Sequence, residues 1–206
     1  MKKDKQESDD LYIFGAGRAI GELEEVEDLY DRYDRVILVE DNPSSKMKHK
    51  KEVISYREAL SLKDDIENGF ISCGDVSFKE RVDCDFSWVH WDNFISDKAD
   101  AYIDYAWGLW VGAFAHLSGK ASVGRHVRLN YGAKVCHHTR VGDYSFISIN
   151  AVLLSGASVG NKSFIGAGAV LLPDVAVGDN CVIGANAVVT KDIPDNTKAM
   201  GVPARW

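Results

Sequence analysis

The residues in this chain best suited to acid–base chemistry are two adjacent histidines, His137 and His138. They stand in the middle of the hexad Val135–Arg140, where side chains can project outward. An imidazole, whose ordinary pKa is about 6.5, can take a proton from an attacking amine or hydroxyl at neutral pH. A solvent-exposed pair without a catalytic role is the alternative, and the spacing alone leaves both open.

The same residues do not predict a metal site. Cys136, His137 and His138 are consecutive in an extended segment and cannot all reach one ion. A zinc site of three histidines needs suitably spaced ligands, and His116, His126 and His137 do not have such an arrangement. We therefore expect no metal.

The elements that must position the histidines follow from a period of six residues. That period matches neither a helix nor an amphipathic strand. It matches three short strands per coil of a parallel β-helix, in which one large aliphatic residue per side fills a narrow interior. The aliphatic column is Val111, Leu117, Val123, Leu129, Val135, Val141, Ile147, Leu153, Val159, Ile165, Leu171, Val177, Ile183 and Val189. Mostly small residues follow four positions after each, such as Ala115, Ala133, Ala151 and Ala169.

Glycine often follows the aliphatic residue, and we expect it to supply backbone freedom at the corners. These glycines are Gly112, Gly124, Gly142, Gly160, Gly166, Gly178 and Gly184. One corner column becomes small along the chain, from Tyr131 and Ile149 to Ala167 and Ala185. Small side chains in this column would border a groove, and a groove of this kind suits a long thin ligand, for example the pantetheine arm of coenzyme A. Small residues are also needed at corners for packing, so the column alone supports either interpretation.

The N-terminal half has a different pattern. Residues 11–14 predict a buried strand that ends in the glycine-rich turn 15–21, and residues 19–33 have the spacing of an amphipathic helix. Residues 35–39 predict a second strand, followed by Glu40 and Asp41. This order is typical of the first half of a nucleotide-binding βαβ unit.

The turn glycines and the helix N-terminus could hold phosphate, while Glu40 or Asp41 could accept ribose hydroxyls. The third glycine comes one position late for the dinucleotide motif, so a mononucleotide or nucleotide-sugar fits better than NAD. A tight turn without a ligand is the alternative.

A second helix is predicted over residues 56–67. Ser55 and Glu58 have the spacing of a capping box at its start. A strand over residues 69–73 follows and leads to Gly74.

Composition divides the chain near residue 92. Residues 1–92 carry 14 Lys and Arg against 23 Asp and Glu, whereas residues 93–206 carry 10 against 8 and contain no Glu. Glu is poor in strands, so its loss marks a change of architecture. We expect a charged tail over residues 1–10, an α/β domain over 11–92 and a β-helix over 93–206.

The net charge of −7 argues against a nucleic-acid partner. No apolar run reaches the length of a membrane span, and the charged N-terminus has no apolar core for a signal peptide. The four cysteines show no framework spacing, which favours reduced thiols and a cytoplasmic location.

Four features together resemble the bacterial nucleotide-sugar acetyltransferases. These are the run Trp88–Ile95, the hexads, the segment Asn130–Asp143 and the ending Gly201–Arg205. The family includes UDP-4-amino-sugar (bacillosamine-type) N-acetyltransferases and sialic acid O-acetyltransferase-like proteins. The resemblance covers residues 11–206, including the order of the domains.

The resemblance implies a left-handed β-helix that forms a homotrimer, with acetyl-CoA between neighbouring subunits. The small Rossmann-like N-terminal domain would hold the nucleotide-sugar. The family's general base falls on His137, and the acid that commonly follows it is His138 here. Family contacts to acetyl-CoA fall on Phe146, Ala167 and Ala185.

Family contacts to the nucleotide-sugar fall on the first turn, on the end of the second strand and on Gly74. In this sequence they are Gly17, Arg18, Ala19, Glu40, Asp41 and Gly74. The family's Gly-Gly-His turn is absent here, and Arg18 and Ala19 stand in its place.

The sequence thus favours an acetyl-CoA-dependent N-acetyltransferase that acts on a nucleotide-activated amino sugar for a bacterial surface glycan. Two alternatives stay open. One is O-acetylation of a sugar hydroxyl by the same base and fold. The other is a catalytically silent nucleotide-sugar-binding trimer, which the altered His138 and first turn keep possible.

Overall fold

The computed structural model describes residues 9–15, 32–44, 47–48, 50–103 and 106–206. The chain forms two compact units, Met1–Asp92 and Asn93–Trp206. Most of the predicted tail over residues 1–10 lies outside the described residues, and Asp10 already belongs to the first strand.

A mostly parallel sheet organises the N-terminal unit. Its strand order is β3-β4-β2-β1-β5-β6, and only the β3–β4 pair is antiparallel. Because β1, β2 and β5 are parallel neighbours, their carboxyl ends meet at one edge. The strands are β1 Asp10–Phe14, β2 Arg35–Glu40, β3 Met47–Lys48, β4 Lys51–Ser55, β5 Asn68–Ile71 and β6 His90–Trp91.

The predicted capping box is confirmed, but the helix that it starts is shorter than expected. Ser55 accepts a hydrogen bond from the Glu58 N–H, and the Glu58 carboxylate accepts one from the Ser55 N–H. Helix α2 spans only Tyr56–Ser61, and a 3-10 turn, Lys63–Asp65, follows. The prediction to residue 67 was wrong. Helix α2 itself buries only Tyr56 and Ala59, and Leu60 and Leu62 are exposed, so a longer helix would gain little from packing there.

Helix α3, Val76–Asp85, was missed by the sequence analysis. Asp75 caps its N-terminus by accepting a hydrogen bond from the Phe78 N–H at 2.9 Å. Phe78 and Val82 have helical spacing after this cap, which is the signal that could have found it.

The helix predicted over residues 19–33 falls mainly on residues 16–31, outside the described part of the chain. Where the description resumes, Arg32 and Tyr33 are not helical. The aromatic core of this unit includes Phe14, whose ring lies 4.8 Å from that of Phe86 and 5.9 Å from that of Trp91.

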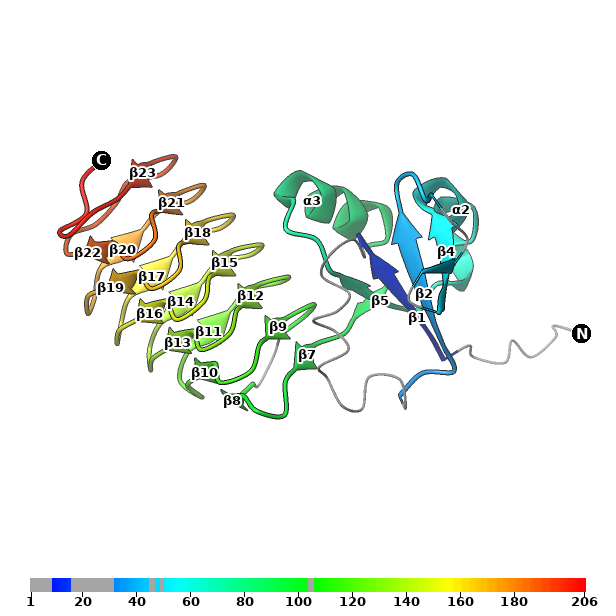
Figure 1. Cartoon of the computed structure of the whole chain (residues 1–206), viewed down its shortest axis with the longest axis horizontal. Helices are drawn as coiled ribbons and strands as arrows, with labels where there is room; N and C mark the ends of the chain where they lie inside the picture. Colours follow the sequence, from blue (N-terminus) through cyan, green and yellow to red (C-terminus); the bar gives the residue numbers. More distant parts are fainter. Residues whose placement is uncertain (1–8, 16–31, 45–46, 49, 104–105) are drawn as a thin grey trace, which may run out of the picture. The chain divides into compact units, whose positions relative to one another are not determined.

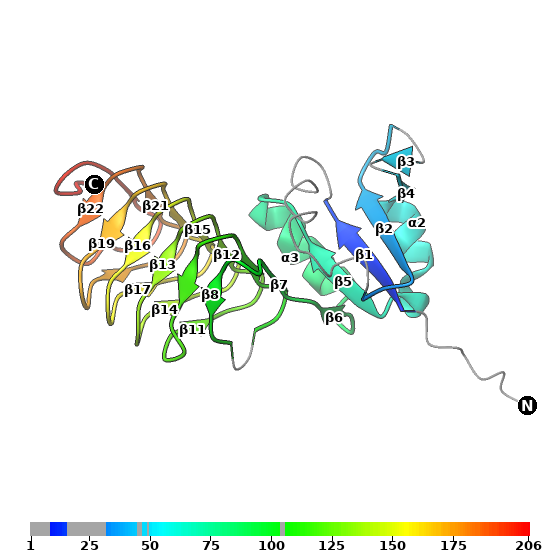
Figure 2. The same ribbon diagram turned by 60° about the horizontal axis from the view of Figure 1, so that its bottom comes forward.

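The C-terminal unit is a parallel β-helix whose coils stack along its axis (Figures 1 and 2). Each full coil has 18 residues, so Leu129 pairs with Ile147, and Ile147 with Ile165. The strands are β7 Phe94–Ile95, β8 Asp100–Ala101, β9 Trp110–Val111, β10 His116–Leu117, β11 Ser122–Val123, β12 Arg128–Leu129, β13 Lys134–Val135, β14 Arg140–Val141, β15 Phe146–Ile147, β16 Val152–Leu153, β17 Ser158–Val159, β18 Phe164–Ile165, β19 Val170–Leu171, β20 Ala176–Val177, β21 Val182–Ile183, β22 Val188–Val189 and β23 Lys198–Ala199.

The interior of the β-helix consists of the predicted columns. The aliphatic residue of each hexad is the second residue of its two-residue strand, and all are buried except the half-buried Val123. Small residues such as Ala133, Ala151 and Ala169 complete the core because larger side chains would not fit between the three sheets.

The glycines after the aliphatic column have a different role from the one expected. None of the seven lies in the left-handed region of backbone space. A Cβ at Gly160 would instead overlap the Asp179 carboxylate and lie 2.6 Å from the Asp179 backbone nitrogen in the next coil. Glycine is therefore required there for close approach, while left-handed backbone occurs at the second residue of the turns, as at His138 with φ 61°.

Four of these glycines, Gly124, Gly142, Gly160 and Gly178, each lie against an Asp or Asn side chain of the next coil, and these side chains form a ladder along one corner. Each accepts a hydrogen bond from the backbone N–H of the preceding coil: Asp143 from Arg125 at 2.9 Å, Asn161 from Asp143 at 2.8 Å and Asp179 from Asn161 at 2.6 Å. Asp195 continues the ladder at 2.8 Å. The ladder binds successive coils together and helps to fix their register.

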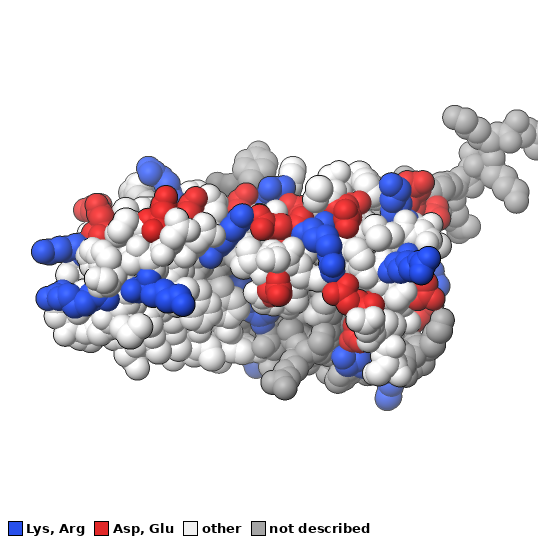
Figure 3. Space-filling model, turned by 90° about the horizontal axis from the view of Figure 1, so that it is seen from above, with Lys and Arg blue, Asp and Glu red and all other residues white. Residues whose placement is uncertain are grey.

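Charged side chains of both signs lie on the C-terminal end of the β-helix. Figure 3 shows basic and acidic side chains at the left of that view, beside a large uncharged area. No helix in the described ranges is both long and apolar enough to cross a membrane.

Candidate functional site

The two predicted histidines lie together on an exposed turn between β13 and β14. Nδ1 of His137 is 2.8 Å from Nδ1 of His138, and the ring centroids are 5.0 Å apart at an interplanar angle of 89°. One of the two nitrogens must carry a proton and donate it to the other. The second histidine therefore occupies the hydrogen-bonding position at Nδ1 that a carboxylate would fill in a His–acid pair.

A serine that the sequence analysis missed completes this cluster. Ser155 Oγ lies 2.8 Å from Nε2 of His137. Ser155 follows His137 by 18 residues, so it occupies the equivalent turn position one coil later. The period of the hexads was the signal that could have found it, because residues one coil apart must be neighbours.

The cluster lies at a different corner from the predicted coenzyme contacts. We call the turns 137–138 and 155–156 the histidine corner, and the turns 167–168 and 185–186 the alanine corner. The first lies between the sheet of β13 and that of β14, and the second between the sheet of β18 and that of β19. Ala185 is exposed and Ala167 half-buried. Because β13 and β19 belong to the same sheet, the two corners of one chain lie at opposite edges of that sheet.

Phe146, the third predicted coenzyme contact, lies at neither corner. It is on β15, where its ring stacks on that of Phe164 at a centroid distance of 5.3 Å. The guanidinium of Arg128 lies 5.6 Å from the same ring and 5.1 Å from that of Trp110. Burial lowers the pKa of Arg128 to about 10, which leaves it charged at neutral pH.

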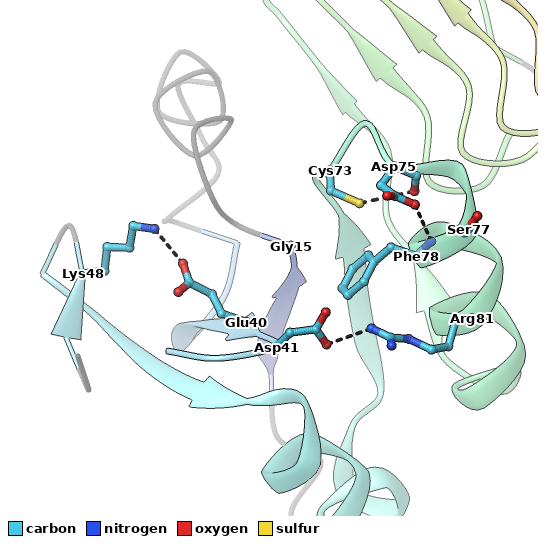
Figure 4. Close-up of a pocket in the computed structure, with 9 residues that line it drawn as sticks. All are labelled: Gly15, Glu40, Asp41, Lys48, Cys73, Asp75, Ser77, Phe78 and Arg81. Atoms are coloured by element: carbon cyan, nitrogen blue, oxygen red, sulfur yellow. Dashed lines mark hydrogen bonds and ion pairs between the residues drawn. The ribbon is translucent and has the colours of Figure 1, made fainter. Parts of the chain in front are cut away.

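The N-terminal unit contains a pocket of about 730 Å³ at the carboxyl ends of its parallel strands (Figure 4). Glu40 and Asp41, which the sequence predicts to accept ribose hydroxyls, are among the residues that line it. Lys48 Nζ donates to Glu40 Oε1 at 2.6 Å, and Arg81 donates to Asp41 Oδ1 at 2.8 Å. The lining residues are Gly15, Glu40, Asp41, Lys48, Cys73, Asp75, Ser77, Phe78 and Arg81.

Several of these residues belong to α3, so the missed helix forms one wall of the pocket. The Arg81 guanidinium lies 4.5 Å from the ring centroid of Tyr56 and 5.0 Å from that of Phe78. Burial raises the pKa of the Cys73 thiol, so this residue is not an activated nucleophile. The wall thus offers a ligand the aromatic face of Phe78 and a guanidinium that is paired with Asp41.

The remaining predicted substrate contacts have different outcomes. Gly74 lies next to Cys73, and a Cβ built on it would contact nothing within 4 Å, so a ligand can approach its backbone. Gly17, Arg18 and Ala19 lie outside the described residues. Among the residues that the structure describes, no group of three His, Cys, Asp or Glu side chains is arranged to hold a metal.

Comparison with protein families matches the coils around the histidine corner. Residues 138–172 and 156–191 each match the bacterial transferase hexapeptide (six repeats) model. Residues 138–191 of the C-terminal unit therefore carry bacterial transferase hexapeptide repeats. These repeats are the hexads of the sequence, and the second match begins 18 residues, or one coil, after the first.

Solved structures extend the similarity beyond the hexapeptide domain to nearly the whole chain. The acetyltransferase domain of PglB from Neisseria gonorrhoeae has a TM-score of 0.86 and 22% identity, over 96% of this chain and 99% of the PglB chain. The same domain solved in complex with acetyl coenzyme A has the same TM-score and identity. PerB from Caulobacter crescentus, in complex with CoA and GDP-perosamine, has a TM-score of 0.83 and 24% identity over 95% of each chain.

WeeI from Acinetobacter baumannii is similar at a TM-score of 0.67 and 19% identity, over 95% of this chain and 98% of WeeI. No curated protein sequence matches the chain. At these identities the structures establish the fold. The parallel sheets and hexapeptide repeats fit a left-handed β-helix.

Proposed function

We propose that this protein transfers an acetyl group from acetyl-CoA to the amino group of a nucleotide-activated amino sugar in bacterial surface glycan synthesis. The observation that carries the proposal is the exposed His137 imidazole, held at Nδ1 by His138 on a hexapeptide coil. The fold shared with PglB and PerB, solved with acetyl coenzyme A or with CoA and GDP-perosamine, supports it.

In the proposed reaction His137 is the general base. When its Nδ1–H donates to His138, Nε2 holds the lone pair and can accept a proton. The sugar amine attacks the thioester carbonyl as it loses this proton, and the C–S bond then breaks. The imidazolium returns the proton to the departing thiolate, so the enzyme ends unchanged.

The N-terminal unit is proposed to be the Rossmann-like domain that binds the nucleotide-sugar. Its pocket at the strand ends matches the position where ligands bind in parallel α/β sheets. Ion pairs with Lys48 and Arg81 are compatible with ribose binding because a carboxylate can accept several hydrogen bonds. Glu40, Asp41 and Gly74 are the described residues proposed for this role, together with Gly17, Arg18 and Ala19.

The active site is proposed to be shared between subunits of a homotrimer. The histidine corner and the alanine corner lie apart in one chain, so a neighbouring chain is proposed to bring its alanine corner to the histidines. Exposed apolar side chains near the alanine corner suit an interface. Phe164 and Val182 lie on β18 and β21 of one sheet, and Ile149 lies on the turn one coil before Ala167. We expect light scattering to give a trimer, and a stable monomer near 22.7 kDa would contradict the shared site.

Turnover of acetyl-CoA with a panel of nucleotide-sugars tests the proposed function. We expect free thiol release only with an amino sugar and a product acetylated on nitrogen. An ester product would instead show O-acetylation, and nucleotide-sugar binding without thiol release would show a catalytically silent protein.

A substitution at the alanine corner tests the position of the coenzyme. Ala185→Trp is expected to raise the dissociation constant for acetyl-CoA at least about tenfold, or roughly 1.4 kcal/mol. Because Ala185 is exposed, the larger side chain should fill the groove without overfilling the core. Binding is measured by isothermal titration calorimetry.

Two controls accompany this variant. Ala185→Ser adds one small polar group at the same position and should bind acetyl-CoA nearly as the wild type does. Nucleotide-sugar binding should be unaffected in both variants because it belongs to the N-terminal unit. Normal acetyl-CoA binding by a folded Ala185→Trp protein would show that the coenzyme lies elsewhere.

A further inference from the structure

We propose that Ser155 relays the proton from the substrate amine to His137, an inference that rests on the proposed acetyl transfer. Both ring nitrogens of His137 are hydrogen-bonded within the chain, Nδ1 to His138 and Nε2 to Ser155, each at 2.8 Å. The base nitrogen therefore faces a hydroxyl. A proton can reach Nε2 through that hydroxyl without any rearrangement of the pair.

The coil geometry holds Ser155 in this position. The Gly156 N–H donates to the His137 carbonyl at 3.2 Å, and the Asp174 N–H donates to the Ser155 carbonyl at 3.1 Å. These bonds join the turns of successive coils and fix their register. Backbone hydrogen bonds between the coils thus hold the Ser155 hydroxyl next to the His137 imidazole.

The neighbouring positions of the same column leave the hydroxyl directed at His137. Pro173, one coil after Ser155, has no polar side chain, and Gly119, one coil before His137, has no side chain at all. Ser155 is half-buried and His137 is exposed, so a substrate can approach the pair from solvent.

Because His138 stands where a carboxylate could be, Ser155 becomes more important in selecting the tautomer of His137. A carboxylate next to His137 could only accept a hydrogen bond and would force the proton onto Nδ1. His138 can donate or accept, so it does not by itself select one tautomer. A hydroxyl that donates to Nε2 favours the form in which His137 Nδ1–H donates to His138, which is the form with a basic Nε2.

The relay step balances without another reactant. As the amine nitrogen bonds to the thioester carbonyl carbon, its proton passes to Ser155 Oγ while the Ser155 hydroxyl proton passes to His137 Nε2. Ser155 remains a neutral hydroxyl, and His137 becomes an imidazolium. After the C–S bond breaks, the same path returns the proton to the thiolate.

A serine within hydrogen-bonding distance of a histidine could also act as a nucleophile. That mechanism would give an acetylated Ser155 and release the coenzyme before the amine reacts. The relay needs no covalent intermediate, so the two mechanisms differ in a product that mass spectrometry detects.

The test compares Ser155→Ala, Ser155→Thr and the control Ser158→Ala in the full-length protein. Ser158 is a half-buried serine on β17 that lies outside the histidine corner. We expect Ser155→Ala to lower kcat at least about tenfold, within the range of acid–base effects, with KM for both substrates nearly unchanged. Ser155→Thr keeps the hydroxyl and should recover most of the activity, while Ser158→Ala should match the wild type.

A proton inventory in mixtures of H₂O and D₂O adds a readout that a purely structural role would not move. The relay predicts two protons in transfer for the wild type and one for Ser155→Ala. Wild-type kcat in Ser155→Ala, no recovery in Ser155→Thr, or acetylated Ser155 would each overturn the relay.

A measurement without substrate separates failure of the relay from failure of the proposed function. The ¹⁵N chemical shift of His137 Nε2 should change in Ser155→Ala if the hydroxyl donates to it, and an unchanged shift would overturn the relay. Absence of acetyl transfer by the wild type would contradict the proposed function instead, whatever this shift shows.

Discussion

Replacing His137 by alanine is expected to lower kcat for acetyl transfer by about two to four orders of magnitude, the usual contribution of a general base. The variant loses the only imidazole that contacts both His138 and Ser155 among the described residues. Acetyl-CoA binding should change little because the coenzyme is proposed to contact Phe146, Ala167 and Ala185. Steady-state kinetics and titration calorimetry measure the two effects.

Two histidine variants are the controls. His138→Ala should be less damaging, because His138 acts through His137. His116→Ala tests a second possible base, since His116 Nδ1 lies 2.8 Å from the Asp100 carboxylate on the outside of the β-helix. It should leave kcat nearly unchanged. A larger loss in His138→Ala would assign the base to His138, and a larger loss in His116→Ala would assign it to the His116–Asp100 pair.

The second large effect concerns the core of the β-helix. Leu171→Ala is expected to lower the free energy of unfolding by about 2–5 kcal/mol, as large-to-small changes in a packed core do. Leu171 is fully buried on β19, and the coils above and below it are held in register, so the cavity cannot close easily. Chemical denaturation at a fixed protein concentration measures the change.

The neighbouring residue is the matched control. Val170 precedes Leu171 on the same strand and points outward, where it is half-buried. Val170→Ala should cost much less than Leu171→Ala. Equal losses would show that the inward and outward faces of this strand are assigned incorrectly.

Local sequence patterns were sufficient for the β-helix. From β9 to β22 each strand contributes one inward aliphatic residue to the core, so the period of six predicts coil length, strand position and the inward face together. The capping box of Ser55 and Glu58 was also predictable because a helix N-terminus is satisfied by residues close in sequence.

Predictions that depended on distant neighbours were less complete. The length of α2 was overestimated because spacing does not show how far a helix remains covered by the rest of the unit. The glycines of the hexads were located correctly, but their reason was not, because the atoms that exclude a side chain belong to the next coil. The helix that forms a wall of the pocket in the N-terminal unit was missed altogether.

The histidine corner shows the same division. The sequence by itself determined that His137 and His138 stand on an outward turn of a coil, because the hexad period places them there. Only the tertiary structure decided which atoms meet: Ser155 faces Nε2, His138 faces Nδ1, and the alanine corner lies apart. The physical reason is that hydrogen bonds between side chains depend on rotamers and on the stacking of coils, neither of which is set by residues adjacent in sequence.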